Sequence, residues 1–194
     1  MKELYFAHPV NTYNTAFETA CEILIAHYLL GGKRDAIENP NQLHHQEGYR
    51  AWKKGDTSHS HRGMSYFFDM VLPNCNNCIA LPYLDERFGL GVAGEMKFYV
   101  VRGIRVWIIE PAKKDVTDAV IAEFVEDPVH TEYFTIRPIH DWEIEYLIYN
   151  DTYLVVPHEE TRLRTWVVYN KVIRPYTEAH LVELPIPDGF YPKE

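Results

Sequence analysis

The sequence predicts an α/β fold of the Rossmann-like, flavodoxin-like kind: a parallel sheet flanked by helices, followed by a strand-rich C-terminal extension. Short apolar runs at residues 4–7, 78–83 and 104–109 are typical of buried strands. Segments with helical periodicity lie between them, and connections of this length join parallel strands. The chain has 194 residues, of which 46% are hydrophobic and 24% are charged, so it can form a domain with a proper core.

The first part of the chain is expected to form a strand, a helix and a long loop. After the strand at residues 4–7, helical periodicity runs through residues 12–30 and ends at a pair of glycines. Residues 38–62 are polar and rich in Asn, His, Gly and Lys, with only weak helical character at 47–53. A long functional loop is therefore expected there.

The middle of the chain completes the alternating pattern. A helix is expected at residues 64–72, broken at Pro73. After the second strand, a glycine-rich turn leads into a helix at 93–102, and Gly103 ends this helix before the third strand. The strands then have the spacing of a parallel sheet covered by helices.

Two units are expected along the chain. Residues 1–112 form the α/β domain, and residues 113–194 form a strand-rich extension packed on the same domain. A short helix is expected at 118–125, and Asn150 with Asp151 is a plausible hairpin turn. Alternating and β-branched runs predict the strands of the extension at residues 133–139, 143–149, 153–156 and 163–173.

Composition argues against several classes of function. A formal net charge of −9 opposes binding to a nucleic-acid backbone, so a small ligand is expected rather than a polymer. No apolar stretch is long enough to span a bilayer and no signal-type segment follows Met1, so we expect no membrane partner and a cytoplasmic location. Three cysteines, an odd number, fit a reducing compartment better than a disulfide framework.

The glycine-rich run at residues 88–96 is the most informative part of the sequence, because it carries Glu95. If the helix begins at Ala93, Glu95 lies in its first turn, where free amide groups and the helix dipole favour the ionised carboxylate. Phe98 and Tyr99 share its helix face, so no helical ion pair is available to it. An unpaired acid over aromatic residues indicates a site rather than a solvated surface.

The same run offers an alternative. Residues 89–94 satisfy Gly-x-Gly-x-x-Gly, and Glu110 ends the following strand as a ribose-binding acid would, which suggests a dinucleotide. Residues 84–88, however, separate the first glycine from its strand. Glu95 would also bring negative charge close to the pyrophosphate.

Cysteine and histidine patterns raise the question of a metal or redox site. Cys75 and Cys78 have CxxC spacing, but a redox pair sits at a helix N-terminus and this pair leads into a strand. Together with a His-x-His sequence they would form a zinc-type ligand set, although that spacing is unusual for structural zinc. Small buried cysteines are the favoured interpretation, and no metal is expected. The histidines of the expected loop are either solvated or line the mouth of a pocket: His44, His45, His59 and His61.

Several features of the chain match a known family. A short strand, Leu-Tyr-Phe-Ala, opens the fold, and Asp69 lies on a helix that precedes an apolar strand. Asp85 follows that strand, and Gly-Leu-Gly comes shortly before Glu95, with Gly103 eight residues later. On these residues the segment 69–111 resembles the nucleoside 2-deoxyribosyltransferases and the related deoxynucleoside-monophosphate N-glycosidases.

The resemblance implies a role for each of these side chains. Glu95 would be the nucleophile that forms a covalent deoxyribosyl ester, and Asp85 would hydrogen-bond or protonate the departing base. Asp69 would help to hold the base or the sugar, and the hydroxyl of Tyr5 would orient Glu95. The resemblance also implies a Rossmann-like fold, no cofactor, and a homo-oligomer in which a neighbour helps to close each pocket.

The substrate cleft is expected where the carboxyl ends of the parallel strands meet. The turn after the first strand, the loop after the middle strand and the helix start converge there. Ala7-His8-Pro9 stands where relatives often have a glycine or small-residue turn, so His8 either replaces the usual contact to a 5′-phosphate or sugar hydroxyl or has a structural role. The expected substrate-binding residues are His8, Asn11, Tyr83, Gly89 and Gly91.

The favoured function is therefore cleavage or base exchange at the N-glycosidic bond of a 2′-deoxynucleoside or its monophosphate. In such chemistry one carboxylate attacks the anomeric carbon while another group manages the leaving base. Two alternatives stay open: a non-catalytic nucleotide-binding or sensing module, and a dinucleotide-dependent oxidoreductase.

Overall fold

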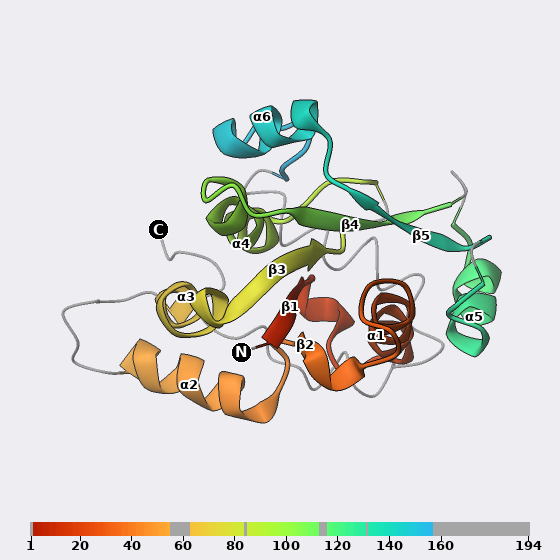
Figure 1. The fold of residues 1–194 in the computed structure, drawn as a ribbon, viewed down its shortest axis with the longest axis horizontal. Coiled ribbons are helices and arrows are strands. Elements are labelled where there is room, and N and C mark those ends of the chain that lie inside the picture. The colour runs from red at the N-terminus through yellow and green to blue at the C-terminus, as the bar shows by residue number, and fades with distance from the viewer. Residues whose placement is uncertain (1, 55–62, 84, 113–115, 131, 157–194) are drawn as a thin grey trace.

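A five-stranded sheet organises the fold, with the strand order β2-β1-β3-β4-β5 (Figure 1). The structure is a computed structural model that describes residues 2–54, 63–83, 85–112, 116–130 and 132–156. Strands β1 to β4 are parallel, and β5 runs antiparallel to β4. The α/β, Rossmann-like fold expected from the sequence is confirmed. The strands are β1 (Lys2–Ala7), β2 (Ile37–Glu38), β3 (Cys75–Ala80), β4 (Val106–Pro111) and β5 (Phe134–Pro138).

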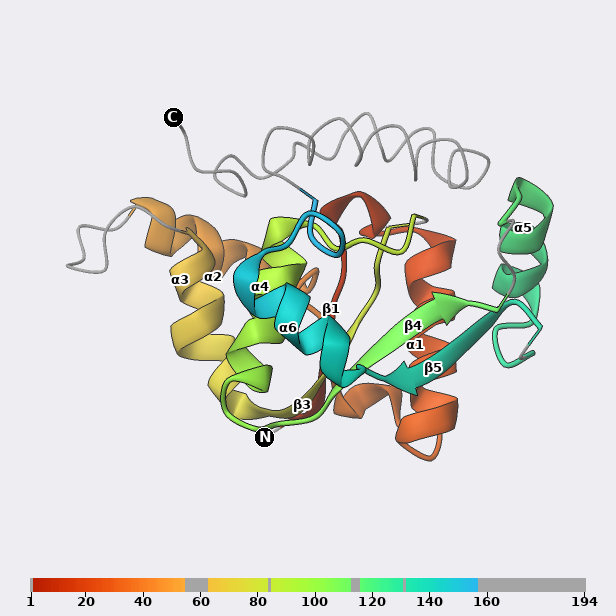
Figure 2. The same cartoon turned by 90° about the horizontal axis from the view of Figure 1, so that it is seen from above.

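Helices cover both faces of the sheet, as Figure 2 shows from above. Helices α1 and α5 lie on one face, and α2, α3, α4 and α6 lie on the other. A π-helical turn (Phe67–Val71) continues α3, and three short 3-10 turns complete the connections (Val10–Thr12, Arg34–Ala36 and Leu72–Asn74). The helices are α1 (Ala16–Leu29), α2 (Leu43–Lys54), α3 (Gly63–Tyr66), α4 (Leu90–Val100), α5 (Asp118–Glu126) and α6 (Asp141–Tyr149).

The alternation of side chains along β1 divides the core into two layers. Leu4 and Phe6 pack in the layer beneath α1 and α5. Tyr5 and Ala7 point to the opposite face and pack in the layer beneath α2, α3 and α4. This alternation places the hydroxyl of Tyr5 on the same face of the sheet as α4, the helix that carries Glu95.

The segment expected to be a long loop is partly regular in the structure. Ile37–Glu38 forms the edge strand β2, and α2 occupies Leu43–Lys54. A strand of two residues is too short to show a periodic pattern, and the apolar residues of α2 are few because one face lies toward solvent. His44 and His45 therefore lie at the start of a helix, whereas His59 and His61 lie outside the described residues.

The extension differs from the expected run of strands. The strand expected at 133–139 is present as β5, but residues 143–149 belong to α6, so the strand predicted there is wrong. Helix α6 begins with a capping box formed by His140 and Glu143, and it ends at Asn150, which takes the left-handed conformation instead of turning a hairpin. The strand predicted at 153–156 is also wrong: the chain turns at residues 152–154, and only Val155 forms an isolated bridge, with Phe88. The strand expected at 163–173 lies outside the described residues.

None of the helices in the described ranges is both long and apolar enough to cross a bilayer. The sheet is extended by β5, and α5 packs in the same core layer as α1. Residues 118–156 thus share the core of the preceding domain.

Two glycines inside helices are expected to respond in opposite ways to alanine. A methyl group at Gly48 of α2 would lie closer than 3.0 Å to the ring of Tyr66, whereas one at Gly94 of α4 would meet its nearest neighbour, Phe68 Cζ, at 3.4 Å. We expect Gly94→Ala to raise the free energy of unfolding by about 0.5–1 kcal/mol through helix propensity. Gly48→Ala should lower it by about 1–2 kcal/mol because Tyr66 must move. Urea unfolding measures both, and an equal gain in the two variants would contradict this packing.

Candidate functional site

Helix α4 starts earlier than the sequence suggests, and this changes the setting of Glu95. Gly89 is the N-cap and Leu90 is the first helical residue, so Glu95 lies in the second turn. The free amide groups of a helix belong to its first turn and do not reach this side chain. The expectation that the helix start stabilises an ionised Glu95 is therefore wrong.

Glu95 instead meets Tyr5 in the interior of the protein. The Tyr5 hydroxyl donates a hydrogen bond of 2.8 Å to Oε1 of Glu95. Both residues are buried, and Glu95 is only 5% exposed. Burial raises the pKa of Glu95 to about 8, and the hydrogen bond from Tyr5 opposes part of this rise. Strand β1 and helix α4 thus bring together two of the residues that the sequence analysis selected.

Further phenols and a thiol surround this carboxyl group. Burial, followed by the charge of Glu95, raises the pKa of Tyr13 well above its usual value, and the same two causes act on the pKa of Cys78. Cys78 is the register partner of Tyr5 on the neighbouring strand β3. Tyr99, one turn beyond Glu95 on α4, donates a 3.0 Å hydrogen bond to the backbone oxygen of Leu72. The site is therefore a carboxyl group in a shell of weak acids that stay protonated at neutral pH.

The CxxC pair belongs to the sheet. Cys75 and Cys78 both lie on β3 and are buried free thiols. Burial raises the pKa of Cys75 to about 12 and that of Cys78 well above its usual value. Reactive thiols have lowered pKa values, so this environment opposes a redox role. The histidines His59 and His61 of the alternative zinc set lie outside the described residues.

Asp85 lies in a different environment, at the carboxyl ends of β3 and β4. Its Oδ2 atom accepts a 3.1 Å ion-pair contact from Nε of Arg87. Both residues line a hollow of about 260 Å³, together with Glu110, Arg137 and two aromatic side chains of the extension, Trp142 and Tyr153. Glu95 and Tyr5 do not line this hollow.

Gly89 and Tyr83 are tied together beside this loop. A methyl group on Gly89 would lie 2.7 Å from the hydroxyl oxygen of Tyr83, so a glycine lets the buried tyrosine lie against the helix start. The backbone nitrogen of Tyr83 donates to the oxygen of Arg87 at 2.8 Å and closes the loop. Gly91 lies inside the first turn of α4. The arrangement fixes the entry of the chain into the helix that carries Glu95.

Asp69 is not brought to Glu95. It lies on the π-helical turn and is exposed, and within the described ranges its side chain makes no hydrogen bond or ion pair. In the same turn, Phe67 and Val71 are buried, and the ring of Phe68 lies against Phe98 of α4. A contact between Asp69 and a substrate at Glu95 stays a prediction.

His8 points toward α1. Its Nδ1 atom lies 2.8 Å from the backbone oxygen of Phe6, and its Nε2 atom lies 2.9 Å from Oε1 of Glu18. Both ring nitrogens have an oxygen partner, so the ring is held between the end of β1 and α1. Although burial raises the pKa of Glu18, hydrogen bonds from His8, Asn39 and the backbone of Asn14 lower it overall. Asn11 lies in the 3-10 turn Val10–Thr12, and its side chain is outside what the structure describes.

A polar hollow of about 470 Å³ adjoins Glu18, between the start of α1 and the end of β2. The residues that follow β2 were not among the site residues predicted from the sequence. Asn39 donates to both Glu18 and Glu22, and the backbone nitrogen of Asn41 donates to Asn39 Oδ1. The sequence Asn-Pro-Asn is typical of a turn. A turn sequence alone does not show which helix or strand the turn will contact. Glu95 does not line this hollow either.

The structure also bears on the dinucleotide alternative. Of the three glycines in Gly-x-Gly-x-x-Gly, Gly91 and Gly94 lie inside α4, and β3 ends at Ala80, well before the first of them. Oε2 of Glu110 accepts a 2.6 Å contact from Nε of Arg137. The dinucleotide fingerprint requires a strand, a tight glycine turn and a helix in direct succession, and the positions of these glycines relative to β3 and α4 differ from that arrangement.

No family model matches the chain, and no curated protein or solved structure matches it. The structural basis for a function is therefore the geometry around Glu95, a buried carboxyl group that is hydrogen-bonded to Tyr5.

Proposed function

We propose that this protein cleaves or exchanges the N-glycosidic bond of a 2′-deoxynucleoside or its monophosphate, with Glu95 as the nucleophile. The observation that carries the proposal is the hydrogen bond of 2.8 Å between the Tyr5 hydroxyl and the buried carboxyl group of Glu95. A tyrosine on the first strand that orients this glutamate is what the resemblance to nucleoside 2-deoxyribosyltransferases implies. The fold that the family shares, a Rossmann-like sheet, is also the fold of this chain.

The proposed reaction is a double displacement. The ionised Glu95 carboxylate attacks the anomeric carbon, a C–O ester bond forms, and the C–N bond to the base breaks with its electron pair leaving on the base nitrogen. Solvent supplies the proton that the departing base takes up, and Asp85, a carboxylate paired with Arg87, accepts a hydrogen bond from the base. Water or a second base then attacks the same carbon, loses a proton, and releases the Glu95 carboxylate.

Two changes at Glu95 must precede the first step: the substrate must gain access to it, and its carboxyl group must ionise. Glu95 is 5% exposed, so a substrate reaches it only if side chains that cover it move. Its raised pKa means that it must lose a proton before it can act as a nucleophile. The hydrogen bond from Tyr5 favours the ionised form and so assists this loss.

The direct test is an exchange assay. The protein is incubated with purine and pyrimidine deoxynucleosides, and separately with their monophosphates, in the presence of a second free base, and the products are separated by liquid chromatography. Release of base supports hydrolysis, and a new nucleoside supports transfer. If no substrate is consumed by the full chain, the proposed function is wrong.

The pH dependence of the reaction follows from the pKa of Glu95. Because the carboxylate is the reactive form, kcat/KM should rise with pH and level off above about pH 8. Tyr5→Phe removes the hydrogen bond that lowers this pKa, so its profile should move to higher pH. Initial rates measured from acidic to alkaline pH give both profiles. A profile that is flat across this range in the wild type would contradict a role for ionised Glu95.

A non-catalytic nucleotide-binding module is the second candidate. Two observations favour it: Glu95 is buried, and Asp85 is engaged in an ion pair with Arg87. Neither carboxyl group is therefore free to react with a substrate in the structure as it stands. This candidate predicts a melting temperature that rises with nucleotide concentration while the nucleotide stays intact. Thermal melts followed by chromatography of the recovered ligand distinguish it from the enzyme.

The proposal includes a cytoplasmic location and a homo-oligomeric state. Cys21, Cys75 and Cys78 are all free thiols, which agrees with a reducing compartment. Oligomerisation comes from the resemblance alone, and sedimentation of the purified chain tests it.

A further inference from the structure

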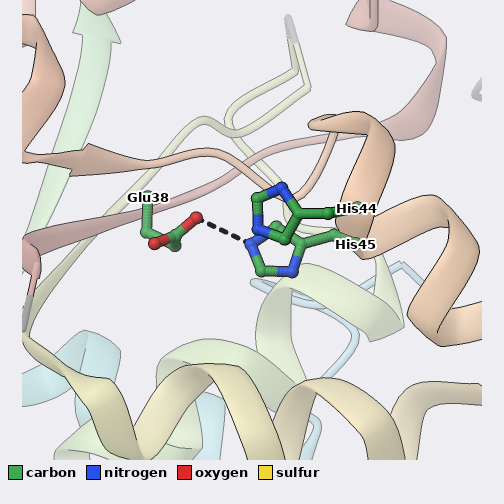
Figure 3. A group of neighbouring side chains, drawn as sticks. All are labelled: Glu38, His44 and His45. Atoms are coloured by element: carbon green, nitrogen blue, oxygen red, sulfur yellow. Dashed lines mark hydrogen bonds and ion pairs between the residues drawn. The ribbon is translucent and has the colours of Figure 1, made fainter.

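Glu38, His44 and His45 converge at the edge of the sheet, where the end of β2 meets the start of α2 (Figure 3). Glu38 is the last residue of β2, and the two histidines lie in the first turn of α2. One ligand atom from each of the three side chains lies within 4.8 Å of the other two. Figure 3 shows the imidazole rings one above the other beside the carboxylate, with His45 linked to Glu38.

Neighbouring side chains orient Glu38 and His45 toward each other. Nε2 of His45 lies 2.6 Å from Oε1 of Glu38, so the imidazole nitrogen and the carboxylate that would share the ion already face each other. The Nδ1 atom of His45 lies 3.0 Å from the Tyr66 hydroxyl, which leaves Nε2 facing Glu38. Second partners of this kind fix the ring orientation of histidines that ligate metals.

We propose that Glu38, His44 and His45 form a binding site for a divalent transition-metal ion of the zinc class. Two imidazole nitrogens and one carboxylate oxygen are a ligand set that zinc uses when a fourth position stays open. Within the described residues this is the group of three such side chains that meets the distance requirement. The inference does not rest on the proposed glycosyl chemistry.

Binding an ion requires the three ligand atoms, which lie within 4.8 Å of one another, to move to the spacing that the ion imposes. Nε2 of His45 and Oε1 of Glu38 are 2.6 Å apart, a hydrogen-bond distance. Tetrahedral zinc, with bonds of about 2.0–2.1 Å, holds two ligand atoms roughly 3.3 Å apart, so the ion would replace the shared proton as this pair opens by less than about 1 Å. His44 is exposed and completes the set from the solvent side, while Glu38 and His45 are 9% and 5% exposed.

The site lies next to the candidate catalytic residues. Glu38 is the register partner of Tyr5, so the two side chains leave adjacent strands on the same face of the sheet. A bound ion would therefore lie one strand away from the Tyr5 hydroxyl that contacts Glu95. It would also hold the start of α2 against the sheet.

Calorimetry on the full chain tests the proposal. The protein is first treated with a chelator and then titrated with Zn²⁺, and Co²⁺ is added separately so that its visible absorption reports a four-coordinate site. We expect one ion per chain. His44→Ala, an exposed position that should not disturb folding, should weaken zinc binding by about 100-fold or more, because loss of even a supporting partner costs roughly 10–100-fold.

Two further variants separate this site from incidental binding. His130→Ala, which removes another exposed histidine, should leave the zinc affinity unchanged. The double variant His59→Ala/His61→Ala should also leave it unchanged. The proposal is overturned if the wild type binds no ion, if His44→Ala binds as tightly as the wild type, or if the double variant alone loses affinity. In any of these cases Glu38 and His45 are a structural ion pair only.

Discussion

Glu95→Gln is expected to abolish N-glycosidic turnover, with kcat/KM reduced roughly 1,000-fold or more, because an amide oxygen cannot replace the nucleophilic carboxylate. The variant keeps the size of the side chain and can still accept the hydrogen bond from Tyr5. Release of base from a deoxynucleoside measures the loss. Glu145→Gln, at an exposed position on α6, is the matched control and should keep full activity.

Stability separates lost chemistry from lost structure in the same variant. The pKa of Glu95 in the folded protein is raised to about 8, above its ordinary value of 4.5. The folded state therefore binds this proton more tightly than the unfolded state, and the stability that the group contributes falls as pH rises from about 4.5 to 8. Glu95→Gln removes this decline, so above about pH 8 the variant should be more stable than the wild type. A variant that is less stable there would contradict the burial of this carboxyl group, whose hydrogen bond from Tyr5 offsets only part of the desolvation.

The second large effect is expected at Arg137, and it concerns stability. Its Nη1 and Nη2 atoms contact Oε2 and Oε1 of Glu143 at 2.7 and 2.8 Å, and its Nε atom contacts Glu110 at 2.6 Å. Glu143 is 3% exposed. Arg137→Met keeps the aliphatic part of the side chain but leaves the Glu143 charge buried without its partner. We expect the free energy of unfolding to fall by about 3–5 kcal/mol, measured by urea unfolding at neutral pH.

A double variant controls for this loss. Arg137→Met/Glu143→Gln removes the buried charge together with its partner and should recover part of the stability. The amide that then replaces the Glu143 carboxylate can still accept the hydrogen bond that the backbone nitrogen of His140 donates at the start of α6. If Arg137→Met costs less than about 1 kcal/mol, the contact between Arg137 and Glu143 does not hold α6 against β5.

Local patterns in the sequence were sufficient for the central sheet. The apolar runs that contain Tyr5, Cys78 and Ile108 predicted three parallel strands, and the alternation within β1 determines which face Tyr5 occupies. The expectation that Tyr5 contacts Glu95 agrees with the observed hydrogen bond. These two residues, 90 positions apart, were paired through the resemblance to a family, since no local pattern relates them.

Features that depend on tertiary contacts could not be predicted in this way. Residues 143–149 alternate as a strand would, yet the capping interaction of Glu143 with the backbone of His140 and its ion pairs with Arg137 accompany a helix. The charge state of Glu95 was misjudged because it depends on one turn of helix at Leu90 and on burial by distant residues. For the same reason the Glu38 and His45 pair could not be recognised from the sequence.

The measurement that tests the central claim most directly is a search for a covalent intermediate. The protein is mixed with a 2′-deoxynucleoside that it turns over, quenched in acid within the first turnover, digested, and examined by mass spectrometry. The account predicts a deoxyribosyl ester on the peptide that contains Glu95, and its absence when Glu95→Gln is treated in the same way. Turnover without an adduct on Glu95, or with an adduct on another residue, would contradict it.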